Sequence, residues 1–385
     1  MTVAVELGET RYDRQERIGW WDQDRLKESR VLVVGAGALG NEVVKNLALV
    51  GVGSIVVIDF DTIEMSNLAR CVFFRAEDEG KPKASTLAAR ARSLNPTIEV
   101  LGIDGDARAF GAGIALRADV IVGALDSREA RLFVNRIAWR AGRPWVDGAI
   151  EALNGVARVF TPPDSCYECT LSETDFEILA HRQSCRLLSR EDLLEGKVPT
   201  TATTASIISG LQSQEVVKLL HRDREGVRIL EGAIVFDGAN NDTYPLRYPV
   251  NDDCLAHHTY TDPIMWEPTI DSTCADLVAA VGWDDAVIEL GDDHIIGWTC
   301  PACEVTSQTG APVALVRFGD SECPQCGEPR QPEVVSSIGV PSTQADTRLI
   351  DLGVRPDEIL AVRRGLDYRY VWAQSPAPEL PESWR

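Results

Sequence analysis

A glycine-rich turn between an apolar run and an amphipathic stretch is the feature that most constrains how this chain can fold. Residues 31–34 are apolar and mostly β-branched, and they lead directly into Gly35-Ala-Gly37-Ala-Leu-Gly40. Apolar residues then recur at helical spacing, at Val43, Val44, Leu47 and Val50. A strand, a glycine turn and a helix in this order predict a phosphate-binding βαβ unit, because free N–H groups at a helix N-terminus attract anions. The same turn serves NAD, FAD and ATP, so it does not identify the ligand by itself.

The sequence after this turn alternates between strand and helix patterns. A second strand over residues 54–58 ends in Asp59, 24 residues after Gly35, which is the acidic position of a nucleotide-binding βαβ unit. Thr200 to Thr204 supply capping hydroxyls for a later helix that runs to Leu220. Other helices are expected near residues 84–93 and 128–141, and other strands near residues 98–101, 119–124, 145–147 and 155–160. This alternation predicts an α/β fold, Rossmann-like, with a mostly parallel sheet covered on both faces.

Length and charge limit the classes of function. A chain of 385 residues suggests two to three domains, and 38 basic against 59 acidic side chains give a net charge of −21. Such an acidic protein is not expected to hold nucleic acid by its phosphates, although a few arginines in one cleft can still bind an anion. The sequence contains neither a membrane-length apolar run nor an amino-terminal signal pattern, so we expect a cytoplasmic protein without a membrane partner.

Composition changes after residue 260. Residues 261–385 contain 21 acidic residues, 8 arginines and no lysine. Two cysteine pairs in this region are Cys300-Pro-Ala-Cys303 and Cys323-Pro-Gln-Cys326. Their Cys-x-x-Cys spacing predicts a four-cysteine zinc ribbon at about residues 298–330. We therefore expect one domain over residues 1–260 and a separate acidic module over residues 261–385, whose last dozen residues form a loose tail.

Four short motifs after the glycine turn give a more specific signal. They are Asp59-Phe-Asp61, Ser66-Asn67-Leu-Ala-Arg70, Gly80-Lys-Pro82-Lys83 and Leu125-Asp126. Hydride transfer needs none of them. An enzyme that cleaves between the α- and β-phosphates of ATP needs cations on the polyphosphate and a carboxylate for Mg²⁺. Arg70, Lys83 and Asp126 have these chemical types.

With Tyr12-Asp-Arg14-Gln15 before the glycine turn, these motifs fall in the order and spacing of a known family. Residues 10–260 resemble the ubiquitin-activating enzyme superfamily, which includes the ThiF- and MoeB-type adenylyltransferases of thiamine and molybdopterin synthesis. Within it, the chain looks most like a single-chain bacterial activator of a ubiquitin-like protein. The resemblance implies a homodimeric or pseudodimeric adenylation fold that activates the C-terminal glycine of a ubiquitin-like protein with Mg-ATP and releases pyrophosphate.

The resemblance also implies roles for individual residues. Asp59 would bind the ribose, and Asp126 would hold magnesium. Arg14 would reach the phosphates, in many members from the partner subunit. The phosphate-binding side chains would be Asn67, Arg70 and Lys83, and the other nucleotide-binding positions are Gly35, Gly37, Gly40 and Asp61.

Two positions depart from the pattern of the superfamily. Cys71 stands where glutamine is usual, and Ser127 stands where asparagine is usual. Neither change removes a charge, so we expect adenylation to be retained.

The structural zinc site of the superfamily is expected in two halves. Cys166-Tyr-Glu-Cys169 matches the first half, and Cys254-Leu-Ala-His257 lies after the long helix, where the second half is expected. Three thiolates and one imidazole suit tetrahedral zinc. His258 and Cys274 are rival fourth ligands. Together with the ribbon, this site predicts two zinc ions per chain.

One cysteine outside both predicted zinc sites is a candidate nucleophile. Cys185 lies in a loop of about residues 166–199, inserted where conjugation-type members of the superfamily place their thioester cysteine. Arg182 and Arg186 flank it, and nearby positive charge favours the thiolate. The implied reaction forms an acyl-adenylate and then a thioester on Cys185, from which the modifier passes to a conjugating enzyme.

Other functions stay open at this point. A sulfur-transfer activator would hand the adenylate to a persulfide, and such proteins often append a rhodanese domain, whose active-site loop is not found after residue 263. A non-catalytic scaffold would only bind the ubiquitin-like partner, but it would not need an intact phosphate-binding set. An NAD-dependent oxidoreductase is a further alternative. If Cys185 is not the nucleophile, Cys71 and Cys274 are the next candidates.

Overall fold

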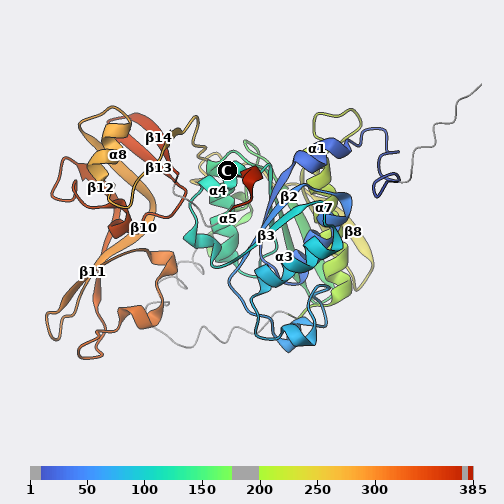
Figure 1. The fold of residues 1–385 in the computed structure, drawn as a ribbon, viewed down its shortest axis with the longest axis horizontal. Helices are drawn as coiled ribbons and strands as arrows, with labels where there is room; N and C mark the ends of the chain where they lie inside the picture. Colours follow the sequence, from blue (N-terminus) through green and yellow to red (C-terminus); the bar gives the residue numbers. More distant parts are fainter. Residues whose placement is uncertain (1–9, 176–198, 375–379, 385) are drawn as a thin grey trace, which may run out of the picture.

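A computed structural model of the protein describes residues 10–175, 199–374 and 380–384. Its larger sheet has eight strands in the order β3-β2-β1-β4-β5-β6-β7-β8 (Figure 1). The first five strands in this order are parallel, and the later neighbours are antiparallel. The strands are β1 (Arg30–Val34), β2 (Ser54–Asp59), β3 (Glu99–Asp104), β4 (Val120–Gly123), β5 (Trp145–Glu151), β6 (Asn154–Phe160), β7 (Gly232–Asp237) and β8 (Asp242–Leu246). The predicted α/β fold with a mostly parallel sheet is confirmed.

Helices cover both faces of this sheet. Val31 and Val33 of β1 pack with α2, α3 and α7, whereas Leu32 and Val34 pack with α4 and α5. The two groups separate because successive side chains of a strand point to opposite faces. The helices are α1 (Gln23–Glu28), α2 (Ala38–Val50), α3 (Lys83–Leu94), α4 (Gly113–Arg117), α5 (Arg128–Arg140) and α7 (Ala202–Leu220).

A second sheet is built from the chain after β8. Five of its strands follow the order β11-β10-β13-β14-β9, and β12 pairs with β10. The elements are β9 (Ile264–Trp266), α8 (Cys274–Ala280), β10 (Ala286–Thr299), β11 (Thr306–Pro312), β12 (Gln331–Val340), β13 (Glu358–Arg364) and β14 (Asp367–Ala373). Leu277 and Val278 of α8 pack on this sheet against Ile288 and Val362 in a core of their own. The division into two domains near residue 260 stays a prediction.

The second sheet packs against the α4 side of the first. Asp357 pairs with Arg117 of α4 at 3.0 Å, and Ile359 of β13 shares a buried cluster with α4 and α5. The chain then returns to the first sheet through a 3-10 helix, η9 (Glu382–Trp384), drawn in red beside α4 in Figure 1. Trp384 is fully buried there, and its indole N–H donates to Ser54 Oγ at 2.8 Å. The expected loose tail is therefore wrong for this last segment, because its tryptophan removes a large apolar surface from water.

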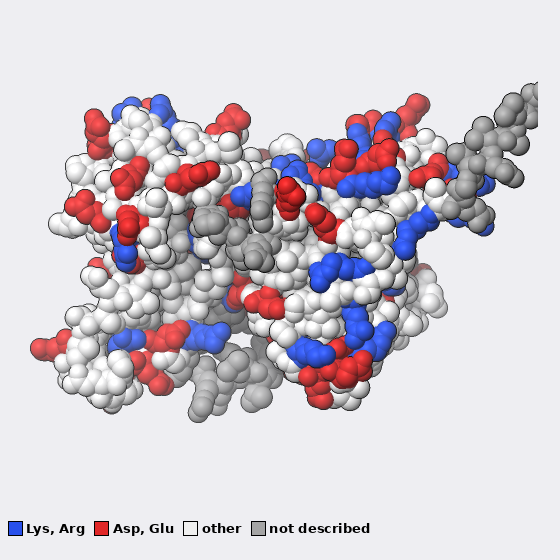
Figure 2. Space-filling view, viewed as in Figure 1, with Lys and Arg blue, Asp and Glu red and all other residues white. Residues whose placement is uncertain are grey.

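The charges on the face shown in Figure 2 are unevenly spread. Lysine and arginine side chains gather mainly over the part that contains α1 and α3, and the second sheet displays more acidic than basic side chains. Within the described ranges, none of the helices combines the length and the apolar character that a membrane crossing requires.

Candidate nucleotide pocket and zinc sites

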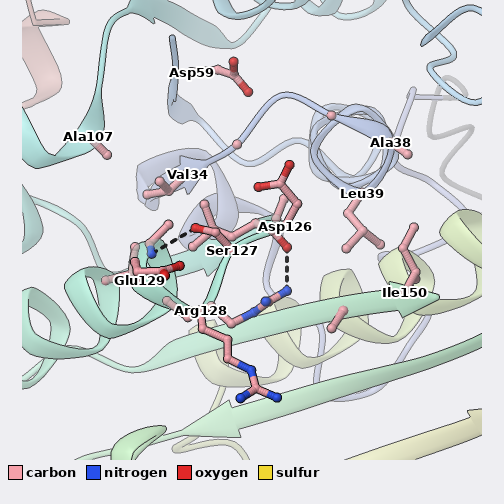
Figure 3. A pocket seen from close by; sticks show the side chains of 18 of the residues that line it. Val34, Ala38, Leu39, Asp59, Ala107, Asp126, Ser127, Arg128, Glu129 and Ile150 are labelled. Atoms are coloured by element: carbon pink, nitrogen blue, oxygen red, sulfur yellow. Dashed lines mark hydrogen bonds between the residues drawn. The ribbon is translucent and has the colours of Figure 1, made fainter. Parts of the chain in front are cut away.

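A cavity of about 990 Å³ opens at the carboxyl ends of the parallel strands. Its walls include the ends of β1 and β2 and the segments that follow β3 and β4. Since β1 lies between β2 and β4, and the chain order reverses there, the cavity occupies the topological switch point at which open α/β sheets bind ligands. Figure 3 shows Asp59, Asp126 and Ser127 around it, with α2 on one side and Ala107 on the other. The predicted residues that line it are Gly35, Gly37, Asp59, Asp61, Asn67, Arg70, Lys83 and Asp126.

The three glycines of the turn serve different purposes. A Cβ on Gly35, whose φ is +103°, would lie 2.3 Å from the carbonyl oxygen of Ala124, and a Cβ on Gly40 would lie 2.0 Å from that of Gly35. These two glycines are therefore required by backbone packing. A Cβ on Gly37 would meet no protein atom within 4 Å. Gly37 lines the cavity at the N-cap of α2, so its missing side chain leaves the backbone open to a ligand.

A buried asparagine that the sequence analysis missed holds this turn. The Nδ2 group of Asn41 donates to the carbonyl oxygens of Ala36 and Gly37 at 2.8 and 3.1 Å, and its Oδ1 accepts from the N–H of Phe73 at 3.1 Å. Asn41 therefore joins the glycine turn to the loop after Arg70. Its sequence position, one residue after the last glycine, gives no separate signal of this role.

The carboxylate of Asp59 is fixed at the end of β2. It accepts hydrogen bonds from the N–H groups of Ala36 at 2.6 Å and Asp61 at 2.8 Å. Burial raises the pKa of Asp59, and these two backbone donors oppose that shift by stabilising the charged form. The group has the position at which a nucleotide-binding βαβ unit binds a ribose hydroxyl.

Cationic side chains line the same cavity. The Nζ atom of Lys83 lies 2.6 Å from Asp61 Oδ2, so the ammonium group is held at the wall, where Lys83 is largely buried. Arg70 follows a 3-10 helix, η1 (Met65–Asn67), and its N–H donates to the carbonyl oxygen of Asn67 at 3.0 Å. Asn67 Oδ1 accepts from the N–H of Glu64 at 2.9 Å, which fixes this short helix.

The loop that carries Asp126 is tied down from two sides. Ser127 Oγ accepts from the N–H of Ala130 at 3.2 Å, so it caps α5, and the departure from the usual asparagine preserves a capping side chain. Arg131, another residue missed from the sequence, is buried and donates to Asp147 Oδ1 and to the carbonyl oxygen of Gly148, both at 3.1 Å. The same guanidinium donates to the carbonyl oxygen of Leu125 at 2.5 Å, directly before Asp126.

Three other residues predicted from the sequence lie outside this group of charged cavity residues. Arg14 is exposed and is not among the residues that line the cavity of its own chain. Cys71 lines the cavity, but burial raises the pKa of its thiol to about 11, which makes it a poor nucleophile at neutral pH. Cys185, like most of the predicted inserted loop, lies outside the described residues.

The first predicted metal set converges in space. Cys166 Sγ lies 3.7 Å from Cys169 Sγ and 3.6 Å from Cys254 Sγ, and Cys169 Sγ lies 3.2 Å from His257 Nε2. Tetrahedral zinc with bonds of about 2.3 Å places thiolates about 3.8 Å apart, whereas a disulfide needs about 2.05 Å. Trp139 stacks on the imidazole at 4.4 Å. Burial lowers the pKa of His257, which favours the neutral form that binds a metal.

Neither rival fourth ligand joins this cluster. His258 Nε2 instead faces the hydroxyl of Tyr370 at 3.0 Å. Cys274 begins α8 and is buried in the core of the second sheet. The geometry therefore selects His257, and the four residues could bind zinc.

The second predicted metal set also converges. Cys300 Sγ lies 3.5 Å from Cys326 Sγ, and Cys303 Sγ lies 3.6 and 3.7 Å from those of Cys323 and Cys326. Backbone N–H groups lower the pKa of Cys323 to about 6, so this thiol ionises readily. Four thiols at these separations could bind a second zinc ion.

Known proteins are similar to this chain in sequence and in fold. A SAMP-activating enzyme E1 of Haloferax volcanii is 32% identical over 284 residues, which cover 70% of this chain and 94% of that protein. A sulfur carrier protein adenylyltransferase of Thermus thermophilus is 38% identical over 169 residues, which cover 41% of this chain and 62% of that protein. Among solved structures, Escherichia coli MccB with ATP has a TM-score of 0.54 at 23% identity, and the match covers 66% of this chain and 75% of that one. This likeness confirms the fold.

The match to a family description covers most of the nucleotide-binding part. It spans residues 12–257, from the segment before the glycine turn to His257 of the first cysteine cluster. The resemblance inferred from the motifs is confirmed, and the chain belongs to the ThiF family.

Proposed function

We propose that this protein adenylates the C-terminal glycine of a ubiquitin-like protein, carries it as a thioester on Cys185, and passes it to a conjugating enzyme. The observation that carries the proposal is the convergence of a ribose-type carboxylate, phosphate-type cations and a second carboxylate on one cavity: Asp59, Arg70, Lys83 and Asp126. A scaffold or a hydride-transfer enzyme does not require this set.

In the first step, a carboxylate oxygen of the glycine attacks the α-phosphorus of ATP. The bond from this phosphorus to the bridging oxygen breaks, and pyrophosphate leaves. Arg70 and Lys83, which line the cavity, would stabilise the charge that develops on the leaving group. Asp126 is the candidate ligand for Mg²⁺, which when bound would neutralise part of the polyphosphate charge.

In the second step, the Cys185 thiolate attacks the carbonyl carbon of the adenylate. A carbon–sulfur bond forms, the carbon–oxygen bond to the phosphate breaks, and AMP leaves. We also propose a homodimer, because the exposed position of Arg14 leaves it free to reach the cavity of a second subunit. Zinc at the two cysteine clusters would have a structural role.

Activation of a sulfur carrier is the second candidate. Similar proteins carry both kinds of name, since one is a SAMP-activating enzyme E1 and others are sulfur carrier adenylyltransferases. Both candidates share the adenylation step, and they differ in what attacks the adenylate.

Two substitutions separate these steps. Asp126→Ala should reduce modifier-dependent ATP–pyrophosphate exchange by about 10²-fold or more, because the Mg²⁺ that neutralises the polyphosphate would lose its protein ligand. Cys185→Ala should leave exchange nearly unchanged and abolish a reductant-sensitive modifier adduct on a non-reducing gel. Cys274→Ala is the matched control and should keep both activities. An adduct that survives in Cys185→Ala would place the nucleophile elsewhere, and a native enzyme with exchange but no adduct would favour sulfur-carrier activation.

A further inference from the structure

We infer that the second sheet positions the nucleoside end of the nucleotide pocket, and that Asp357 and Glu358 are positioning residues for ATP. The connection runs through residues 105–117, which touch the cavity at one end and the second sheet at the other. The inference rests on the proposed function, because it concerns the same ATP site.

The first end of this segment forms a wall of the cavity. Gly105, Ala107 and Arg108 line it, and Ala107 is seen at its edge in Figure 3. The N–H of Gly105 donates to the carbonyl oxygen of Asp59 at 3.1 Å. Asp106 holds the guanidinium of Arg108 through contacts of 3.0 and 2.6 Å, so the wall is internally braced.

The other end of the segment is bound by the second sheet. The N–H groups of Gly111 and Gly113 donate to the carbonyl oxygens of Pro356 and Asp357 at 3.0 and 2.9 Å. The N–H of Ala112 donates to Glu358 Oε1 at 3.3 Å. The residues at the start of β13 therefore accept hydrogen bonds from three consecutive backbone N–H groups.

Asp357 is the centre of this junction. It is 1% exposed and has a φ of +60°, a left-handed conformation that aspartate tolerates better than most residues. Both of its carboxylate oxygens accept from the Arg117 guanidinium at 3.0 Å, and Oδ1 also accepts from the indole N–H of Trp372 at 2.8 Å. A buried carboxylate with these three donors fixes α4 to the second sheet.

The wall belongs to the nucleoside end of the pocket. Asp59 is the ribose-type acid, and the wall is bonded to its backbone, whereas the phosphate-type groups approach from the glycine turn, from the segment after η1 and from α3. Ala107 and Phe110 also pack with Ile359 of β13 in one hydrophobic cluster. A displaced second sheet would therefore move the wall beside the ribose and leave the phosphate groups in place.

Gly111 gives a way to separate the sheets locally. A Cβ there would lie 2.3 Å from Glu358 Cα and 2.6 Å from the carbonyl carbon of Asp357, so Gly111→Ala must shift one backbone against the other. Gly111 does not line the cavity. Gly339→Ala is the matched control, because a Cβ on Gly339 of β12 would meet nothing within 4 Å.

The test measures equilibrium binding of ATP and of AMP to the full chain without a modifier. Gly111→Ala should weaken both nucleotides by the same factor, about tenfold, so that the ATP/AMP affinity ratio is unchanged. Arg70→Ala should weaken ATP much more than AMP. Gly339→Ala should bind both as the native protein does.

Any different outcome contradicts either the inference or the proposed function. Native affinities in Gly111→Ala, or a loss for ATP alone, would overturn the inference. A native protein that does not bind ATP would instead overturn the proposed function. If Gly111→Ala does not fold, Arg117→Lys replaces it, since this change keeps the charge but loses the two-pronged contact with Asp357, and the same equal loss is expected.

Discussion

Two glycines of the same turn show what single residues decide here: Gly40 faces backbone, and Gly37 faces the cavity. Gly40→Ala should destabilise the fold by about 3 kcal/mol or more, because its Cβ overlaps a carbonyl oxygen. Gly37→Ala should have the same melting temperature as the native protein. It should bind ATP more weakly, because the new methyl group would occupy space next to the phosphates. Thermal melting and nucleotide titration of both variants check this pair, and a large loss of stability in Gly37→Ala would contradict it.

The buried thiols allow a second prediction at this scale. Burial raises the pKa of both Cys71 and Cys274 to about 11, so at pH 8 only about 10⁻³ of each is thiolate. Iodoacetamide at pH 8 should leave both unlabelled in the folded protein and label both in denaturant. Mass spectrometry of the peptides measures the labelling. Rapid labelling of Cys71 in the folded protein would make it a candidate nucleophile again.

The sequence predicted the polar residues of the pocket better than the residues that hold them. Asp59, Lys83 and Asp126 stand in short motifs, so their chemistry is visible in one dimension. Asn41 acts through the carbonyl oxygen of Ala36 in the turn and the N–H of Phe73 in a later loop, and Arg131 acts through the carbonyl oxygen of Gly148. Their roles depend on the folded backbone, which no motif records.

At the scale of elements, the alternating pattern located the parallel strands closely. The helix expected at residues 128–141 is α5 (Arg128–Arg140), and the threonine-rich segment caps α7 through Thr201 Oγ1, which accepts from the N–H of Thr204 at 3.2 Å. The second sheet was missed. Its strand β12 is mostly exposed and does not alternate, so it lacks the signal of a half-buried strand.

The cysteine clusters give the prediction at this scale. Native protein should contain two zinc ions, and Cys300→Ser should contain one, because a serine hydroxyl is a poor zinc ligand and the first cluster is separate. Metal analysis after extensive dialysis measures this number. Cys274→Ser is the matched control and should keep both ions, whereas one ion or none in the native protein would contradict the assignment.

For the whole molecule, the return of the chain to the first sheet was the feature that sequence could not supply. The last residues are rich in proline and charge, which is typical of loose tails. Residues 380–384 are held by Trp384, whose indole N–H donates to Ser54 of β2 and whose carbonyl oxygen accepts from Arg117 of α4 at 2.7 Å. Such a site exists only after the first sheet and α4 have formed.

Trp384→Ala should therefore destabilise the protein by about 3–5 kcal/mol, because a fully buried indole and its hydrogen bond to Ser54 are lost. Chemical denaturation followed by a probe in each sheet measures the effect. Ser383→Ala is the control, since its hydroxyl contacts Glu99 at the surface, and it should change stability by less than about 0.5 kcal/mol. An unchanged midpoint in Trp384→Ala would mean that the contact does not support the fold.

The contact between Ser54 and Trp384 spans 330 positions of the chain. On the ribosome, β2 is made well before Trp384, its packing partner 330 residues later. Until Trp384 emerges, the side of β2 near α4 is incompletely covered, and apolar surface exposed during synthesis is prone to misassembly. A domain that looks self-contained in sequence thus completes its packing only after the segment that contains Trp384 has left the ribosome.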